Sequence, residues 1–216
     1  MTIAAALNIR YRHVAAAAAM AVLLASPAVA QAQQSTSPKA FVKGMTSTVL
    51  TELTSSKISD SDRVKRMRRL LVRYFDIPVV GKFVLGVHWR RTKEAQFKEF
   101  LKLYEIYVAH NYAGLFKKYT GETIDVLREQ PSGGDTTLVF GRINQPSGPA
   151  IAMEIRVHKN NSEYKALDLK IEGVSMPLTH RKQFSSVINR GRKGVQGLIA
   201  ALRRATDRFE AETPSQ

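Results

Sequence analysis

The chain has 216 residues, a formal net charge of +15 at pH 7 and no cysteine. Without cysteine it has neither disulfides nor thiolate metal ligands, so the fold depends on its apolar core. The excess of cations favours an anionic partner such as lipid headgroups, an acidic protein surface or nucleic acid, although a dispersed positive surface also keeps a protein soluble without any specific site.

Residues 1–30 have the three-part layout of a secretory signal peptide. Arg10 and Arg12 precede an apolar run at 14–25, and small residues follow it. The run is too short to cross a bilayer core of roughly 30 Å comfortably, which disfavours the alternative of a membrane anchor. We therefore expect cleavage after Ala30 or Ala32 and a periplasmic mature chain. Export makes nucleic acid the weakest of the three anionic partners.

The chain without this leader has the size of a single domain. We expect a domain over residues 31–212 and a disordered tail over 213–216. The leader contains two of the 33 Lys and Arg residues and none of the 18 Asp and Glu residues, so the remaining chain carries a formal charge of +13.

Residues 40–120 have helical periodicity. Over 62–74, apolar residues recur at three- and four-residue spacing with basic residues between them, which predicts a basic amphipathic helix with one buried stripe. Pro78 disfavours helical geometry at the residue before it, so we expect a break there and a short apolar helix after it. A second long helix is expected after Thr92, a candidate N-cap.

Residues 122–174 change to a period of two. Apolar and polar side chains alternate over 151–158 and 167–172, which is typical of strands with one buried and one wet face. Turn-rich loops separate such runs, so four strands in a meander are expected. Helical patterns return after them. The predicted fold class is α+β, with helices packed on one face of a curved four-stranded antiparallel sheet, NTF2-like, enclosing an apolar cavity.

The sequence assembles no catalytic or metal site. Residues 173–177 lack the second glycine of a nucleophile elbow, and the histidines lack metal-binding spacing. His158 is expected to be solvated, and Asp76 to serve as a turn or cap residue. The enzymatic alternative is a steroid-handling cone with Asp168 as base. Asp168 alternates out of phase with its apolar neighbours and should face away from the cavity, which argues against that alternative.

Two colinear stretches carry a family resemblance. The first is Tyr-Phe-Asp-Ile-Pro at 74–78, followed by the Gly-Lys-Phe-Val-Leu-Gly run at 81–86 and by Trp89. The second is residues 168–176, where a Gly-Val-Ser triplet leads into the last helices. These stretches resemble the MlaC family of periplasmic phospholipid-binding proteins, also known as the toluene-tolerance auxiliary transport family. The similarity spans roughly 41–202.

The resemblance implies a carrier that is not an enzyme and has no cofactor other than phospholipid bound as cargo. It implies a monomer that shuttles phospholipid between an outer-membrane lipoprotein complex and the lipid-binding subunit of an inner-membrane ABC transporter, and so maintains outer-membrane lipid asymmetry. One departure is Tyr164 and Ala166, where the family commonly has a Trp before the strand's Asp. The alternatives are a carrier of hopanoid or another lipid and a non-carrier interaction protein of the cell envelope.

The candidate lipid-binding side chains are apolar or aromatic and lie on the predicted stripes, where ordinary core packing is the alternative for each of them. The basic residues of 62–74 are expected to contribute to docking at the transporter through long-range attraction. The helical candidates are Phe75, Val80, Val84, Trp89, Tyr104, Tyr112 and Phe116. The strand candidates are Leu138, Phe140, Met153, Ile155, Leu167, Leu169 and Ile171.

Overall fold

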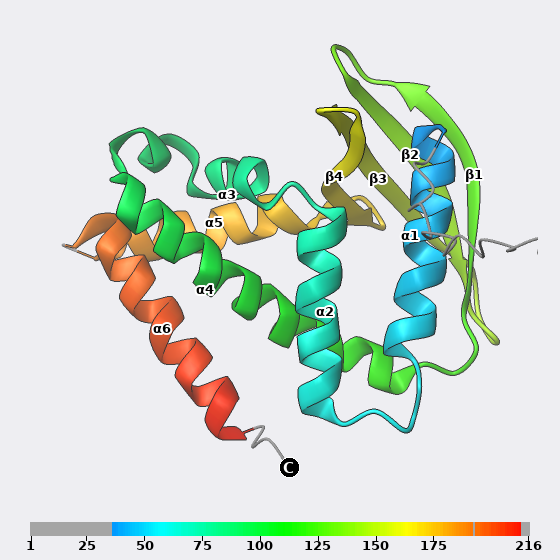
Figure 1. Ribbon diagram of the computed structural model, residues 1–216, viewed down its shortest axis with the longest axis horizontal. Helices are drawn as coiled ribbons and strands as arrows, with labels where there is room; N and C mark the ends of the chain where they lie inside the picture. The colour runs from blue at the N-terminus through cyan, green and yellow to red at the C-terminus, as the bar shows by residue number, and fades with distance from the viewer. Residues whose placement is uncertain (1–35, 192, 213–216) are drawn as a thin grey trace, which may run out of the picture. The chain divides into compact units, whose positions relative to one another are not determined.

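The computed structural model describes residues 36–191 and 193–212. The predicted signal peptide and the predicted tail lie outside the described residues. Helices precede and follow a single antiparallel sheet in the described part of the chain (Figure 1). The elements before the sheet are α1 (Pro38–Leu53), α2 (Asp60–Tyr74), α3 (Ile77–Leu85), the 3₁₀ helix η1 (Gly86–Arg91), α4 (Glu94–Ala113) and the 3₁₀ helix η2 (Gly114–Lys118).

Helix α2 is capped and amphipathic. The Ser59 side chain accepts a hydrogen bond from the backbone N–H of Asp62 at 3.0 Å, and Asp62 lies in the first turn, where the helix dipole favours negative charge. Met67 and Leu71 lie on the buried stripe predicted from the periodicity, and α2 packs on α4. The start of α4 differs from the prediction, because Lys93 and not Thr92 occupies the N-cap position.

Arg63 departs from the solvated face expected for the basic residues of α2. It is only 3% exposed, and its guanidinium donates to the backbone carbonyls of Leu53, at the end of α1, and of Ser55. A cation there also interacts favourably with the negative end of the α1 dipole. Arg66 donates to a backbone carbonyl of α1, and Arg68 pairs with a carboxylate of α4. Several α2 cations therefore hold helices together.

The segment between α2 and α3, where a break was predicted before Pro78, contacts the sheet. Phe75 forms an isolated parallel bridge with Ala166, and the Asp76 backbone N–H donates to the Ala166 carbonyl at 3.1 Å. The Asp76 side chain then caps α3 by accepting from the Val79 N–H at 3.1 Å. Asp76 is therefore the cap residue that the sequence predicted, and α3 is the short apolar helix expected after it.

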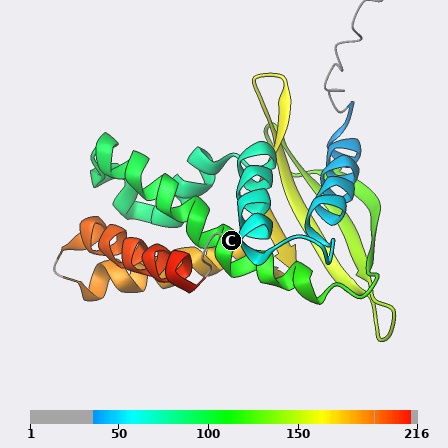
Figure 2. The same cartoon turned by 60° about the horizontal axis from the view of Figure 1, so that its bottom comes forward.

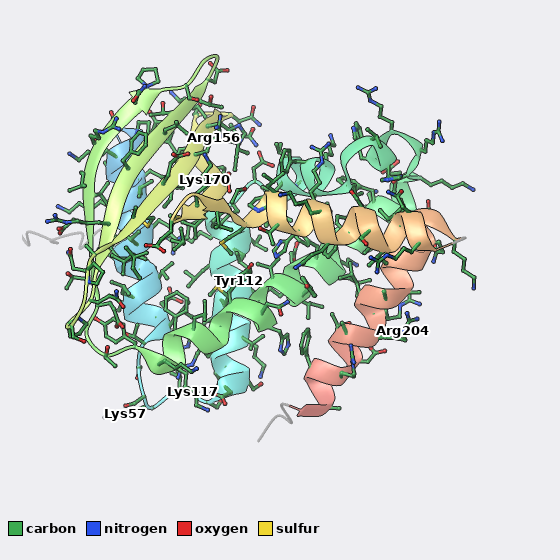
Figure 3. The ribbon with its side chains drawn as sticks, turned by 180° about the vertical axis from the view of Figure 1, so that it is seen from behind. Lys57, Tyr112, Lys117, Arg156, Lys170 and Arg204 are labelled. Atoms are coloured by element: carbon green, nitrogen blue, oxygen red, sulfur yellow. The ribbon has the colours of Figure 1, made fainter. Side chains whose placement is uncertain are left out.

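The sheet has five antiparallel strands in sequential order, one more than predicted. The additional strand contains two residues and pairs only with the end of β4, so no hydrophobic alternation marks it in the sequence. Helices cover one face of the sheet, as the views from opposite sides in Figures 1 and 3 show. The strands are β1 (Thr123–Pro131), β2 (Thr136–Asn144), β3 (Ile151–Asn160), β4 (Glu163–Ile171) and β5 (Val174–Ser175).

The two faces of β2 are reversed relative to the prediction. Val139 is fully buried and lies opposite Ile155, whereas Leu138 and Phe140 lie opposite charged residues of β3 on the outer face. The sequence of β2 is apolar in both phases, and Gly141 decides between them. A Cβ at Gly141 would lie 2.6 Å from the backbone carbonyl oxygen of Asp125 in β1 and 2.8 Å from the Met153 side chain, so the inner face needs glycine there.

A β-bulge shifts the phase of β4. Asp168 lies opposite Arg156, but the next paired residue of β4 is Ala166, opposite Val157, so Leu167 is the extra residue. Leu167 does not pack against the main core, whereas Ala166 is fully buried. The strict alternation assumed for Leu167 was therefore wrong, although Leu169 keeps its predicted inward position.

The last two helices pack mainly on other helices. They are α5 (Met176–Arg190), which lies against α3, and α6 (Gly194–Glu212), which lies alongside α4 (Figure 2). Phe100 of α4 is fully buried and contacts Tyr104 and Phe184. Within the described ranges, no helix is both long and apolar enough to span a bilayer.

Candidate functional site

An apolar pocket lies where four helices meet the end of β4. Its cavity volume is about 40 Å³. One water molecule needs roughly 10–15 Å³ by such a measure, so the pocket has room for a few atoms in this conformation. The lining residues are Leu71, Phe75, Ile77, Val80, Tyr104, Glu105, Val108, Leu169, Met176, Pro177 and His180.

A tight hairpin places α5 beside the pocket. Glu172 and Gly173 both have positive φ, at 49° and 77°, as the two-residue connection between β4 and β5 requires. The Ser175 hydroxyl accepts from the Leu178 N–H at 3.2 Å, so α5 begins directly after β5. The next residues, Met176 and Pro177, line the pocket. The Gly-Val-Ser triplet is thus a turn, a strand and a helix cap that together position one wall.

His180 is the main buried polar group at the pocket. Its Nδ1 lies 2.9 Å from the Tyr104 hydroxyl and its Nε2 lies 3.1 Å from the hydroxyl of Tyr112, which Figure 3 labels. A neutral imidazole has one donor and one acceptor, so one tyrosine donates to the ring and the other accepts from it. Burial lowers the pKa of His180 to about 4 and raises that of both tyrosines. The three side chains are therefore uncharged at neutral pH.

Glu105 is the charged residue of the lining. Its Oε2 accepts from the Arg68 guanidinium at 3.1 and 3.2 Å, and its side chain is 17% exposed against 44% for that of Arg68. A charge-assisted pair of this kind satisfies the carboxylate beside an otherwise apolar wall. It joins α2 to α4 at one side of the pocket.

Four predicted site residues are brought together in the pocket: Phe75, Val80, Tyr104 and Leu169. Tyr112 reaches the pocket indirectly, through its hydrogen bond to His180. The other inward candidates belong to the main core beside the pocket, because Val84, Met153 and Ile155 are buried there and Phe116 and Ile171 pack against it.

Four candidates do not face the pocket. Trp89 is 37% exposed on η1, with Lys82 Nζ 4.7 Å from its ring centroid. Phe140 lies on the outer face of the sheet under the Arg128 guanidinium, 3.7 Å from the ring centroid. Leu138 shares that outer face, and Leu167 is the bulge residue.

Sequence reasoning missed seven lining residues, and helical spacing could have found two of them. Pro177 and His180 precede Phe184 and Ile188 at three- and four-residue spacing, so they continue the stripe of α5. His180 is a core residue of α5 and is 4% exposed. Leu71 was predicted to be buried but not to line a pocket. The others are Ile77, Glu105, Val108 and Met176.

The acid–base candidates are engaged in structural contacts. Asp168 accepts a hydrogen bond from the Ser175 hydroxyl at 3.0 Å and does not line the pocket; burial raises its pKa. His158 was expected to be solvated, which is wrong: its side chain is 17% exposed and its Nε2 lies 3.0 Å from Asp76 Oδ2. Within residues 36–191 and 193–212, no three His, Asp or Glu residues gather closely enough to hold a metal ion.

Comparison with known proteins identifies the fold and the family. The structure is similar to that of a phospholipid-binding protein from Ralstonia solanacearum, solved in complex with a phospholipid, with a TM-score of 0.69 and 21% sequence identity. The match covers 79% of this chain and 97% of that protein. The family model described as MlaC protein matches residues 43–204, most of the sequence, and the chain therefore belongs to the MlaC family.

Proposed function

We propose that this protein is a periplasmic carrier that binds phospholipid and moves it between membranes, without catalytic activity. The observation that carries the proposal is an apolar pocket in a chain of the MlaC family. The structural likeness to the Ralstonia solanacearum protein, which was solved with a phospholipid, supports the same cargo.

The chemistry of the pocket suits transport. Exposing an acyl chain to water costs about 0.8 kcal/mol per methylene, so a soluble carrier must enclose its cargo. Apolar side chains do this without any acid, base or nucleophile, and the polar groups at this pocket already have partners. Glu105 is paired with Arg68, and His180 contacts two tyrosine hydroxyls.

The pocket must enlarge to take a lipid. Two acyl chains need several hundred Å³, the range of ordinary ligand pockets, against the cavity volume of about 40 Å³ here. The mobile wall in the proposal is formed by α3 and α5, which supply Ile77, Val80, Met176 and Pro177 to the lining and pack on each other. Separation of these helices from α4 and β4 opens the space between them.

The cellular role that we propose is the one that the resemblance to the MlaC family implies. The carrier passes phospholipid between an outer-membrane lipoprotein complex and the lipid-binding subunit of an inner-membrane ABC transporter, and so maintains outer-membrane asymmetry. The cleavable signal peptide predicted over residues 1–30 supports a periplasmic location. A chain that diffuses between two membranes as a monomer is consistent with a dispersed positive surface, which keeps it soluble.

The test compares two substitutions with the same chemistry on opposite faces of the sheet. Leu169→Glu places a carboxylate in the pocket, where burial without a partner is strongly unfavourable. It should remove at least nine-tenths of the phospholipid that mass spectrometry finds in an organic extract of the purified protein. Leu138→Glu on the outer face should keep the wild-type amount.

Circular dichroism must show both variants folded for the comparison to count. Wild-type protein that is folded and free of lipid would contradict the carrier and favour an envelope interaction protein. Equal lipid loss in both variants would contradict the assignment of the pocket. The extract also identifies the lipid, and a hopanoid in place of a phospholipid would correct the cargo.

A further inference from the structure

Two segments that meet in space contain no acidic residue. Residues 77–93 and residues 173–206 have neither Asp nor Glu. The first segment forms α3 and η1, the second includes α5, and α3 and α5 pack on each other. The surface that they share is therefore positive by composition. Its exposed cations around α3, η1 and the first turns of α5 include Lys82, Arg90, Arg91 and Lys182.

Large apolar side chains are exposed on the same two segments. Val87 is 73% exposed and Phe83 is 43% exposed, although Phe83 lies next to the fully buried Val84. Exposed apolar groups gathered on one surface indicate an interaction site, whereas single ones do not. We define the α3–α5 patch as Val79, Phe83, Val87, Trp89 and Leu178.

The cations and the rings of the patch are in contact. Lys82 Nζ lies 4.7 Å from the centroid of Trp89, and the Arg181 guanidinium carbon lies 5.1 Å from the centroid of Phe83. Leu178 lies one turn before Arg181 on α5. Each exposed ring thus has a long cationic side chain beside it, with an apolar stem that can follow the ring and a charged end that stays in water.

Neighbouring carboxylates do not neutralise this surface. The acidic residues of α4 are already paired, Glu94 with Lys98, Glu99 with Arg203 and Glu105 with Arg68. Asp76, at the start of α3, caps that helix and is buried. Among the described residues, no ion pair involves Lys82, and the same holds for Arg90, Arg91, Arg181 and Lys182.

We propose that the α3–α5 patch docks reversibly on an anionic phospholipid bilayer. Aromatic and aliphatic groups would enter the boundary between headgroups and acyl chains, while the adjacent cations contact phosphates. The proposal rests on the carrier function in one respect: α3 and α5 also form a wall of the pocket. Docking therefore sets the pocket wall directly against the membrane that gives or receives the lipid.

The test measures binding of the purified chain to vesicles by sedimentation. Vesicles that contain phosphatidylglycerol should bind the protein, and vesicles of phosphatidylcholine alone should not. Binding should weaken as salt rises, because the Debye length falls from ~10 Å at 0.1 M to ~3 Å at 1 M. Each cation near an anionic surface strengthens binding about fivefold, so Lys82→Glu with Arg90→Glu and Arg91→Glu should weaken it on the order of 100-fold or more.

The control reverses three exposed lysines elsewhere and has the same net charge. It combines Lys43→Glu on α1, Lys57→Glu in the loop after α1 and Lys118→Glu on η2. Figure 3 labels Lys57, well away from α3. This control should keep most of the binding. Val87→Asp, at an exposed position that does not threaten folding, tests the apolar part and should weaken binding at least tenfold.

Equal loss in the two triple variants would overturn the proposal, because net charge alone would then explain binding. Wild-type protein that ignores anionic vesicles but binds vesicles carrying envelope proteins would also overturn it, in favour of a protein partner. Lipid extracted from each variant separates this proposal from the carrier function. If the wild-type protein co-purifies with phospholipid but does not bind vesicles, only the docking proposal is rejected. If it binds vesicles but contains no lipid, only the carrier function is rejected.

Discussion

His180 makes stability depend on pH. Its pKa in the folded protein is about 4, against about 6.5 in the unfolded chain, because burial disfavours the imidazolium. Between these values the unfolded state binds more protons. The stabilisation is therefore complete above about pH 6.5 and is lost as the pH falls towards 4. We expect the free energy of unfolding, measured in urea, to fall by up to roughly 3 kcal/mol over this range.

A residue that does not titrate provides the control. His180→Gln keeps a donor and an acceptor for Tyr104 and Tyr112 but has no proton to gain. The variant should be less stable than wild type at pH 7 and should show a flatter pH dependence between 6.5 and 4. An unchanged slope would mean that carboxylates and not His180 dominate acid unfolding.

Arg63 illustrates how a cation can belong to the core. Its guanidinium donates to backbone carbonyls at the end of α1 and in the loop that follows. Arg63→Ala leaves those carbonyls without their donor and removes a buried side chain, so it should lower the free energy of unfolding by about 3 kcal/mol. Arg69→Ala, at an exposed position of the same helix, should change it by less than about 0.5 kcal/mol. Equal effects would contradict the structural role of Arg63.

At the scale of elements, the Asp76 side chain connects α3 with β3. Its carboxylate caps α3, accepts from the Asn160 side chain at 2.8 Å and lies 3.0 Å from His158 Nε2. The last two residues belong to the end of β3. One side chain thus ties the start of α3 to the hairpin of β3 and β4, which explains physically why the motif at 74–78 contains an acid before Ile77.

Removing this carboxylate should loosen the hairpin. Asp76→Ala abolishes the cap of α3 and removes the carboxylate that faces Asn160 and the buried Nε2 of His158, so we expect a loss of about 2–3 kcal/mol in unfolding free energy. Hydrogen exchange of the amides in β3 and β4 should accelerate more than that of the amides in α6. Asp135→Ala, in the exposed turn between β1 and β2, is the matched control and should leave both measurements unchanged. Uniform acceleration across the chain would contradict the local connection.

The elements could be predicted from sequence better than the faces they present. The stripe over 62–74 and the break before Pro78 depend on local spacing, and both appear in the structure. The phase of β2 depends instead on the close approach of Gly141 to the Asp125 backbone and to Met153, contacts between strands that no local pattern contains. The bulge at Leu167 likewise arises from pairing between strands. Leu138, Phe140 and Leu167 were misplaced for these reasons.

At the scale of the whole molecule, the sequence predicted an apolar cavity, but it predicted only four of the residues that line the observed pocket. The pocket is lined by one to three residues from each of several elements, such as Leu71, Val108 and Pro177. Which member of a buried stripe lines a cavity and which fills the core depends on how helices pack, and periodicity does not report it. The exposed position of Trp89 has the same origin, since η1 presents it beside Lys82.

The small pocket volume has a kinetic consequence. If the closed conformation predominates, the measured dissociation constant for lipid is the intrinsic one divided by the fraction of molecules that are open, so an open fraction of about 1% weakens apparent affinity roughly 100-fold. The rate of lipid loading is then limited by the rate at which the pocket opens. In a fluorescent-lipid transfer assay, the initial rate should reach a plateau as vesicle concentration rises, with the plateau set by the opening rate. Substitutions that loosen the contact of α3 with α4 should raise that plateau.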